Sequence, residues 1–255
     1  MRFPALALVV LAAALSAPAA AADAILPSTL LGASVTKAIA AYGLPSAVTS
    51  RNDGHHFFFD VAGVGVDAIV DAENGTVRAL DVRGAAPATL AMDVDGKPRT
   101  FGFGTYAATQ ADADLANVAD YSLDAQRLYR LSPARELVLG FEKSTGTLAR
   151  VVVGDRSALV RLNVFPNEPV EKTFPFVAPK LRGSGLPKDG AGARVTIVRL
   201  DVDRTGAVTE VGIVVASDDA AYDAFVVKKI AGDTYIPAKL GIRPIASSVY
   251  REFRH

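Results

Sequence analysis

The chain has 255 residues, which suits one large domain or two to three small ones, and half of its residues are hydrophobic. Its 27 basic residues balance its 27 acidic residues, so no long-range field favours nucleic acid or an anionic membrane, and no local basic patch stands out. It has no cysteine, which excludes disulfides and a lipid-modified cysteine anchor, so the fold depends on its apolar cores.

Residues 1–22 have the layout of a secretory signal peptide. Arg2 is followed by an apolar run from about Ala5 to Leu15 and then by small, alanine-rich residues, with cleavage expected after Ala22. The run is shorter than the roughly 20 residues that span a bilayer. We therefore predict an exported periplasmic protein. The alternative is an uncleaved inner-membrane anchor, because the alanine tail lengthens the apolar segment.

Residues 23–98 are predicted to form a helix followed by a small antiparallel sheet. The helix is expected in SVTKAIAAYGLP, which begins at the capping residue Ser34, has an apolar face and ends at a glycine and a proline. The sequence after it is β-rich, and Asn74-Gly75 is a strong hairpin signal. A second hairpin is expected with its tip at Asp95-Gly96.

Residues 99–164 repeat this order with low sequence identity. The segment TQADADLANVADY is a second candidate helix, and β-rich runs follow it. Gly75-Thr76-Val77 aligns with Gly146-Thr147-Leu148, an offset of 71 residues. We therefore expect an α+β protein in which two tandem modules, each a helix plus an antiparallel sheet, precede a C-terminal domain.

Residues 165–177 are rich in proline, which removes main-chain donors, and are expected to be a linker. Residues 178–255 then read as strand, strand, helix and strand. The helix is predicted in DDAAYDAFVVKKIAGD, with Ser217 or Asp218 as its cap and an acidic first turn. The last strand is expected in ASSVYREF.

The stretch DVDRTG imitates the first half of a calcium-binding loop. Asp201, Asp203 and Thr205 are suitably spaced oxygen donors, and Gly206 follows them. The glutamate that such a loop needs at its twelfth position is missing, because Gly212 occupies it. The flanking segments are β-branched, whereas the motif lies between helices. We therefore predict a hairpin turn and no metal site.

No residue pattern indicates catalysis. His55 and His56 are adjacent in a predicted strand and point to opposite faces, so they are poorly placed to bind one metal ion. Ser184 lies in a segment rich in proline and glycine, with no histidine placed to activate it. We therefore predict a non-enzyme without cofactor or metal.

The predicted C-terminal helix is followed by an aromatic-x-Pro-Ala segment, a Gly-x-Pro turn and a last strand. With these features, residues 178–255 resemble the TonB C-terminal domain family. The resemblance implies a small ββαβ fold that binds another protein, and it suggests a link to TonB-dependent outer-membrane transport. The matching residues are Asp203, Gly206, Val208, Val211, Ser217, Asp223, Tyr235, Pro237, Ala238, Gly241 and Pro244.

Two features depart from that family's energy transducers, which carry an uncleaved membrane helix and a long proline-rich spacer. Here the N-terminal segment looks cleavable, and a region expected to fold takes the spacer's place. The segment GASVTKAIAAYGLPSAV, together with the repeat, makes residues 28–164 similar to tandem SmpA/OmlA-like and β-lactamase-inhibitor-like modules. That second resemblance implies inhibition of a hydrolase or a role in envelope assembly.

The function expected first is a periplasmic adaptor that binds a protein by strand addition, because a small sheet leaves an edge of unpaired main-chain groups. The expected partner is an outer-membrane receptor or another envelope protein, with no nucleic acid. The alternative is that this edge is capped and inert or pairs with a second copy to form a homodimer. A membrane-anchored energy transducer is a further alternative function. The expected partner-binding residues are Ser247, Ser248, Val249, Tyr250, Arg251, Phe253 and Arg254, and the expected turn residues are Asp203, Gly206, Pro237 and Gly241.

Within that last strand, the alternation of side chains places Val249 and Phe253 toward the helix. Tyr250 and Arg254 are then expected to face outward or toward the ligand.

Overall fold

The computed structural model describes residues 30–51, 54–61, 63–123, 125–161, 176–183, 192 and 194–255. The predicted signal peptide, residues 165–175 of the predicted linker, and Ser184 lie outside the described residues. None of the helices within the described ranges has the length and hydropathy of a membrane span.

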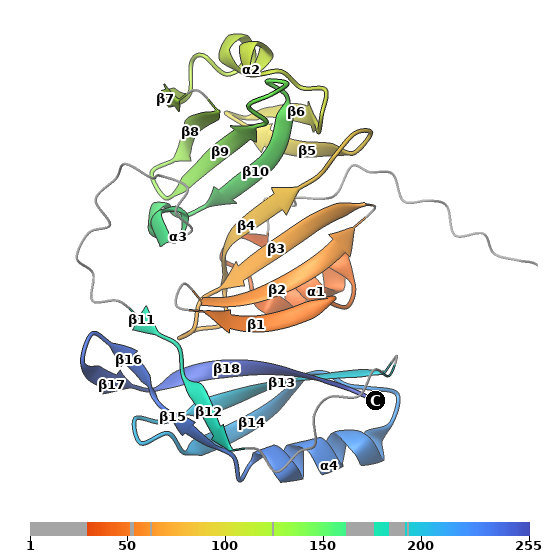
Figure 1. The fold of residues 1–255 in the computed structure, drawn as a ribbon, viewed down its shortest axis with the longest axis vertical. Coiled ribbons are helices and arrows are strands. Elements are labelled where there is room, and N and C mark those ends of the chain that lie inside the picture. Colours follow the sequence, from red (N-terminus) through yellow and green to blue (C-terminus); the bar gives the residue numbers. More distant parts are fainter. Residues whose placement is uncertain are drawn as a thin grey trace, which may run out of the picture.

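An eight-stranded antiparallel sheet forms the larger part of the fold (Figure 1). Its strands follow in the order β1-β2-β3-β4-β10-β9-β8-β7, and the separate β5–β6 hairpin is inserted between β4 and α2. The elements of this part are α1 (Val35–Tyr42), β1 (Ala47–Arg51), β2 (Gly54–Val61), β3 (Val64–Val70), β4 (Val77–Arg83), β5 (Thr89–Val94), β6 (Lys97–Gly102), α2 (Ala108–Asp114), β7 (Ala119–Leu123), β8 (Gln126–Ser132), β9 (Arg135–Phe141), β10 (Leu148–Gly154) and α3 (Arg156–Arg161).

The predicted α+β fold class with two tandem modules is wrong. Strands make up 54% and helices 16% of the described structure, so the protein is mostly β. Strand β4 pairs directly with β10, which joins both runs of strands into one sheet. Val82 faces Val151 across this seam, and both side chains lie in the same core. The pairing removes two exposed strand edges, which explains why the two halves do not stay separate.

One local arrangement does recur at the offset of 71 residues. Gly75 and Gly146 both have positive φ, 69° and 68°, in the turns after β3 and β9. The carbonyl of Gly75 accepts from the Val35 amide at 3.2 Å, and that of Gly146 accepts from the Ala108 amide at 3.1 Å. Each hairpin turn therefore holds the first residue of the preceding helix.

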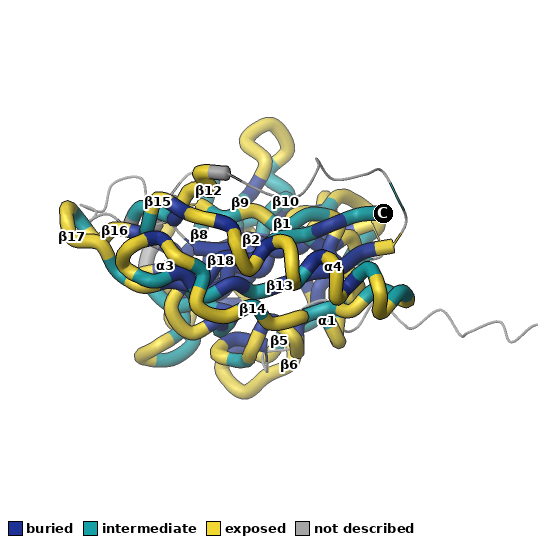
Figure 2. The backbone as a smooth tube through the Cα atoms, turned by 90° about the horizontal axis from the view of Figure 1, so that it is seen from below, coloured by how far each residue is buried: buried dark blue, intermediate teal, exposed yellow. Residues whose placement is uncertain are grey.

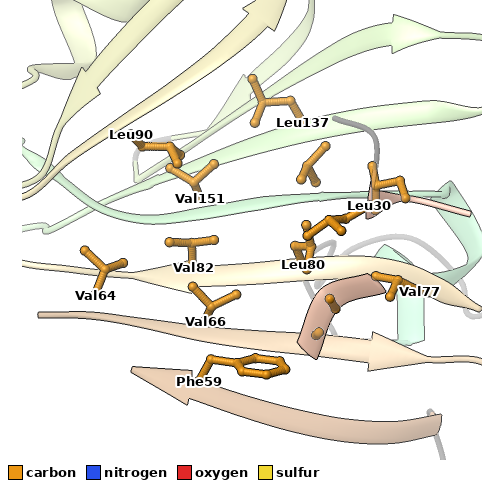
Figure 3. Packing of buried hydrophobic residues seen from close by; sticks show 14 of the residues in the cluster. Leu30, Phe59, Val64, Val66, Val77, Leu80, Val82, Leu90, Leu137 and Val151 are labelled. Atoms are coloured by element: carbon orange, nitrogen blue, oxygen red, sulfur yellow. The ribbon is translucent and has the colours of Figure 1, made fainter. Parts of the chain in front are cut away.

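The main core covers one face of the large sheet. Val66, Val82 and Val151 come from neighbouring strands, and Leu30 and Leu90 pack on them from outside the sheet (Figure 3). Alternate residues of each strand point to this face, which is why the buried positions recur at every second residue in β3.

The C-terminal region is built on a three-stranded sheet in the order β14-β13-β18, with α4 on one face (Figure 1). Its element order contains the predicted strand, strand, helix and strand, with short strands added before the last one. The elements are β11 (Phe176–Val177), β12 (Lys180–Gly183), β13 (Val195–Val202), β14 (Val208–Val215), α4 (Ala220–Ile230), β15 (Thr234–Ile236), β16 (Ala238–Leu240), β17 (Arg243–Ile245) and β18 (Ser247–Arg254).

Helix α4 begins one or two residues later than predicted. Its cap is Asp219, whose side chain accepts from the amides of Ala221 and Tyr222 at 3.1 Å. Ser217 instead donates its hydroxyl to Asp223 at 2.9 Å. Asp223 is buried and needs such donors, so Ser217 is used to satisfy this carboxylate rather than to cap the helix.

The segment before the last domain adds strands to it. Strand β12 pairs with β15, and β11 pairs with β16, which also pairs with β17. Pro237 separates β15 from β16. Residues 176–177, which were expected to belong to the linker, therefore form part of a small sheet at one end of the C-terminal region.

Candidate protein-binding groove

The strand predicted to bind a partner, β18, lies against the large sheet of its own chain. It runs beside β1 (Figure 1), and Ser247, Ser248, Val249, Tyr250 and Phe253 are buried. The Ser248 amide donates to the Ala72 carbonyl at 3.0 Å, and Arg254 Nη2 donates to the Ser46 carbonyl at 3.1 Å. The expectation that this strand is an open edge is therefore not met, because the chain itself covers it.

The predicted alternation along β18 is present. Val249 and Phe253 pack in the cluster that contains Val226 of α4. Tyr250 points to the other face, where its ring lies edge-on to the rings of His55 and Phe57, with centroids 5.0 and 5.1 Å away. Burial raises the pKa of Tyr250. Tyr250 therefore fastens the C-terminal region to β2, in the place where a ligand was expected.

The remaining charged residues of β18 have partners within the chain. Arg251 forms an ion pair with the buried Asp233, and Arg254 forms one with Glu252. The predicted binding residues that are not buried, Arg251 and Arg254, are therefore engaged in ion pairs within the chain. Their contacts indicate a structural role for β18.

The two adjacent histidines face different partners. The Nδ1 atom of His56 lies 2.8 Å from Asp67, whereas His55 is fully buried beneath Tyr250, with its Nδ1 2.8 Å from the Ser50 hydroxyl. Burial lowers the pKa of His55 to about 4, against the opposing effect of the nearby Ser248 carbonyl. His55 is therefore neutral at physiological pH, at the junction between the large sheet and β18.

Strand β14 lies at the opposite edge of the three-stranded sheet and, among the described residues, pairs with β13 alone. Residues 210–213 pair with 201–198 in unbroken register, and register shifts lie at both ends of this stretch. Ile213 is 45% exposed. Because main-chain groups alternate in direction along an antiparallel strand, half of those in β14 point away from β13.

A groove of about 460 Å³ runs beside this edge. The start of α1 and the β3–β4 turn form its other wall. Its lining residues are Ser34, Val35, Thr36, Asn74, Gly75, Arg199, Asp201, Glu210, Gly212, Ile213, Val214 and Tyr250.

The floor of the groove is polar and internally hydrogen-bonded. Arg199 Nε donates to Asp201 Oδ1 at 3.0 Å and contacts the Ser248 hydroxyl at 3.1 Å, and that hydroxyl donates to Asp201 at 2.8 Å. Gly212 lies opposite Arg199, and a Cβ atom there would meet no other atom within 4 Å. The groove therefore combines a fixed charge pair with open space beside an unpaired strand edge.

The predicted turn at Asp203 is confirmed. Asp203 accepts from the Thr205 hydroxyl and amide and from the Ala207 amide, and these hydrogen bonds lower its pKa. Gly206 has φ 91°, and a Cβ atom there would lie 1.9 Å from the Tyr235 carbonyl oxygen. The carboxylate that suggested a calcium ligand therefore stabilises its own hairpin, and the glycine also permits close approach of β15.

The other two predicted turn residues also lie in turns or breaks. Pro237 stands between β15 and β16, and Gly241, with φ 62°, forms the turn between β16 and β17. Within the part of the chain that the structure describes, no group of three or more His, Asp or Glu residues is placed to hold a metal ion.

The similarity of this chain to known proteins is to solved structures, at low sequence identity. No protein-family model matches the chain, and no curated protein matches it. A cysteine-rich secretory protein from Staphylococcus aureus is 12% identical, with a TM-score of 0.33 over 51% of this chain and 46% of that one. An extracellular protein containing an SCP domain from Bacillus anthracis is 15% identical, with a TM-score of 0.34 over 55% and 48%. This chain spans about half the length of each of these structures.

Sequence reasoning missed the groove because its residues come from three distant segments. The alternating pattern predicts β13 and β14 as strands but does not say which edge of their sheet a neighbour covers. Residues 34–36 and 74–75 carry no binding motif, and packing alone brings them opposite β14.

Proposed function

We propose that the protein is an exported, non-enzymatic adaptor that binds an extended segment of another envelope protein along β14. One observation carries the proposal: β14 ends its sheet without a neighbour among the described residues, and a groove lies beside it. An extended peptide binds such an edge by completing the ladder of main-chain hydrogen bonds. The binding strand thus changes from β18 to β14.

The size of the open edge sets the expected affinity. Residues 210–213 present about four outward main-chain groups, each worth about 1 kcal/mol when paired. That sum corresponds to a dissociation constant of about 1 mM. Contact of one apolar peptide side chain with Ile213 tightens it to about 10–100 µM. The adaptor therefore binds and releases its partner readily.

The groove floor supplies selectivity. Successive side chains of an added strand point alternately to the two faces of the sheet, so every second one enters the groove. There it meets Arg199 and Asp201, whose charges favour a polar or charged residue. An aliphatic residue at a neighbouring position contacts Ile213. The resemblance of residues 178–255 to the TonB C-terminal domain supports a partner from the cell envelope, such as an outer-membrane receptor.

The test uses two neighbouring substitutions, Gly212→Pro and Ile213→Pro. Because main-chain direction alternates, one of them removes an amide that faces β13 and the other removes an outward amide. Peptides from envelope proteins are titrated into the isotopically labelled chain, and amide shifts are followed by NMR. The variant without the outward amide keeps its melting temperature but loses about tenfold in peptide affinity.

Peptide binding that is unchanged in both variants, or shifts confined to the large sheet, would refute the proposal. The second outcome would favour the large sheet as the binding surface. Export is tested separately by N-terminal sequencing of the protein recovered from the envelope, which should start at residue 23. Retention of residues 1–22 would indicate the anchored form.

A further inference from the structure

Two small sheets at one end of the C-terminal region, β12-β15 and β11-β16-β17, carry most of the large aliphatic residues that are exposed. We name residues 180–182 and 236–243 the cationic apolar tip. Of the seven large hydrophobic residues exposed in the described chain, four belong to it. They are Leu181 at 40%, Ile236 at 40%, Leu240 at 42% and Ile242 at 97%.

The same tip is strongly basic. Lys180, Arg182, Lys239 and Arg243 lie within it and are exposed, and residues 176–183 and 234–245 contain no Asp or Glu. None of these four cations forms an ion pair within the described residues. Elsewhere the described arginines commonly face carboxylates, as Arg78 faces Asp155. The tip therefore carries a local positive charge on a chain whose net charge is zero.

Strand pairing brings the cations and the aliphatic residues together. Lys180 pairs with Ile236 across β12 and β15, and Arg243 pairs with Leu240 across β16 and β17. Paired residues of neighbouring strands point to the same side of a sheet. Long basic side chains can bury their hydrocarbon stems while keeping the charged ends in water, so each pair presents apolar surface edged by a cation.

The tip projects from the molecule. In Figure 1 the β16–β17 hairpin extends sideways beyond the three-stranded sheet, and in Figure 2 its exposed turn lies at one end of the molecule. Gly241 has φ 62°, which allows the tight turn that places Ile242 at its end. An almost fully exposed isoleucine on a projecting turn is suited to insertion into a deformable apolar environment.

We propose that the cationic apolar tip binds the surface of an anionic lipid bilayer. Ile242 and Leu240 enter the boundary between head groups and acyl chains, while the four cations contact anionic head groups. A bilayer fits better than a protein partner, because the most exposed residue, Ile242, stands on a projecting turn and the charge of the tip has one sign. None of the tip residues lines the groove beside β14, so this site is independent of the proposed adaptor function.

The chain has no tryptophan, so a single introduced tryptophan reports insertion without background. Ile242→Trp is compared with Leu44→Trp, because Leu44 is 54% exposed and lies outside the tip. The chain from residue 23 onward, which keeps every described residue, is mixed with phosphatidylcholine vesicles with or without phosphatidylglycerol. Fluorescence of the Ile242→Trp variant shifts to the blue only with phosphatidylglycerol present, and fluorescence of the Leu44→Trp variant does not shift.

Co-sedimentation then measures the partition coefficient. Each cation contributes about fivefold near an anionic surface, so Lys239→Gln combined with Arg243→Gln lowers partitioning roughly 25-fold. Ile242→Ser lowers it about tenfold. Leu44→Ser and Lys228→Gln, an exposed leucine and an exposed lysine outside the tip, leave it unchanged. Added salt weakens binding of the unaltered chain.

Several results would overturn the inference. One is failure to bind anionic vesicles, and another is equal binding to neutral ones. If the fluorescence of the Ile242→Trp variant shifts to the blue without vesicles, and the shift follows dimer formation in ultracentrifugation, then the tip binds a second copy of the chain. Binding to an acidic peptide with no vesicle binding would make a protein the occupant. Loss of vesicle binding leaves the peptide titration of β14 unaffected, so the two proposals fail separately.

Discussion

Acidification should destabilise the protein through His55. This histidine is fully buried, and the groups around it are the Ser50 hydroxyl, the Ser248 carbonyl and the Tyr250 ring, with the charges of Asp71 and Arg199 and the neighbouring His56 further away. Burial lowers its pKa from 6.5 to about 4, so the unfolded chain takes up the proton more readily than the folded one.

The sign and size of the effect follow from linkage. The contribution of neutral His55 to stability is complete above pH 6.5, falls as the pH falls, and is lost near pH 4. A fall of the pKa from 6.5 to about 4 corresponds to about 3 kcal/mol of unfolding free energy. Burial favours raised pKa values for Asp155 and Asp223, but hydrogen bonds to both carboxylates outweigh this effect and hold both pKa values below 3.8. Protonation of these carboxylates therefore affects stability only at lower pH than protonation of His55.

The assay is guanidinium-induced unfolding at several pH values between 7 and 4, for the unaltered chain and for His55→Phe. Phenylalanine keeps an aromatic ring against Tyr250 but does not titrate. The unaltered chain loses about 3 kcal/mol more than the variant over this range. Ionisable groups that do not interact with His55 contribute equally to both proteins and cancel in the difference. Equal pH slopes for the two chains would refute the reasoning.

Two further substitutions probe the C-terminal fold. Gly206→Ala places a Cβ atom 1.9 Å from the Tyr235 carbonyl oxygen at φ 91°, so it should lower the free energy of unfolding by about 2–4 kcal/mol. Gly212→Ala, which meets only open space, should change it by about 0.5 kcal/mol or less, and equal melting temperatures would contradict this account. Asp223→Ala leaves the buried Thr196 hydroxyl without its 2.6 Å partner and should cost about 1–3 kcal/mol in chemical unfolding. A variant as stable as the parent would show that this carboxylate is not structurally required.

The predictions that the structure confirms depend on a few neighbouring residues. Hairpins form at Asn74-Gly75 and Asp95-Gly96, where Gly75, Asp95 and Gly96 have positive φ. The structure also confirms the turn at Gly206 and the alternation of side chains along β18 that places Val249 toward α4. Such features follow from backbone sterics and side-chain period, which a short sequence window already contains.

The predictions that failed required knowledge of distant partners. Ser217 satisfies the general rule for a helix cap, but the buried Asp223 competes for its hydroxyl. The edge of β18 is covered by β1, about 200 residues earlier in the chain, although nothing in the sequence of either strand marks the contact. The fold class failed for the same reason, because the pairing of β4 with β10 joins strands on opposite sides of a long insertion.

By itself, the sequence determined where the chain turns and which strands alternate, because these features depend on local geometry. Only the tertiary structure decided which strand edges stay open and which surfaces gather charge. Residues 180–182 and 236–243 are each short and ordinary in a chain of zero net charge, yet the pairing of β12 with β15 and of β16 with β17 places them in one cationic apolar tip. An open strand edge or a charged surface patch is formed by residues that are far apart in sequence. Only the fold determines which of these residues lie together.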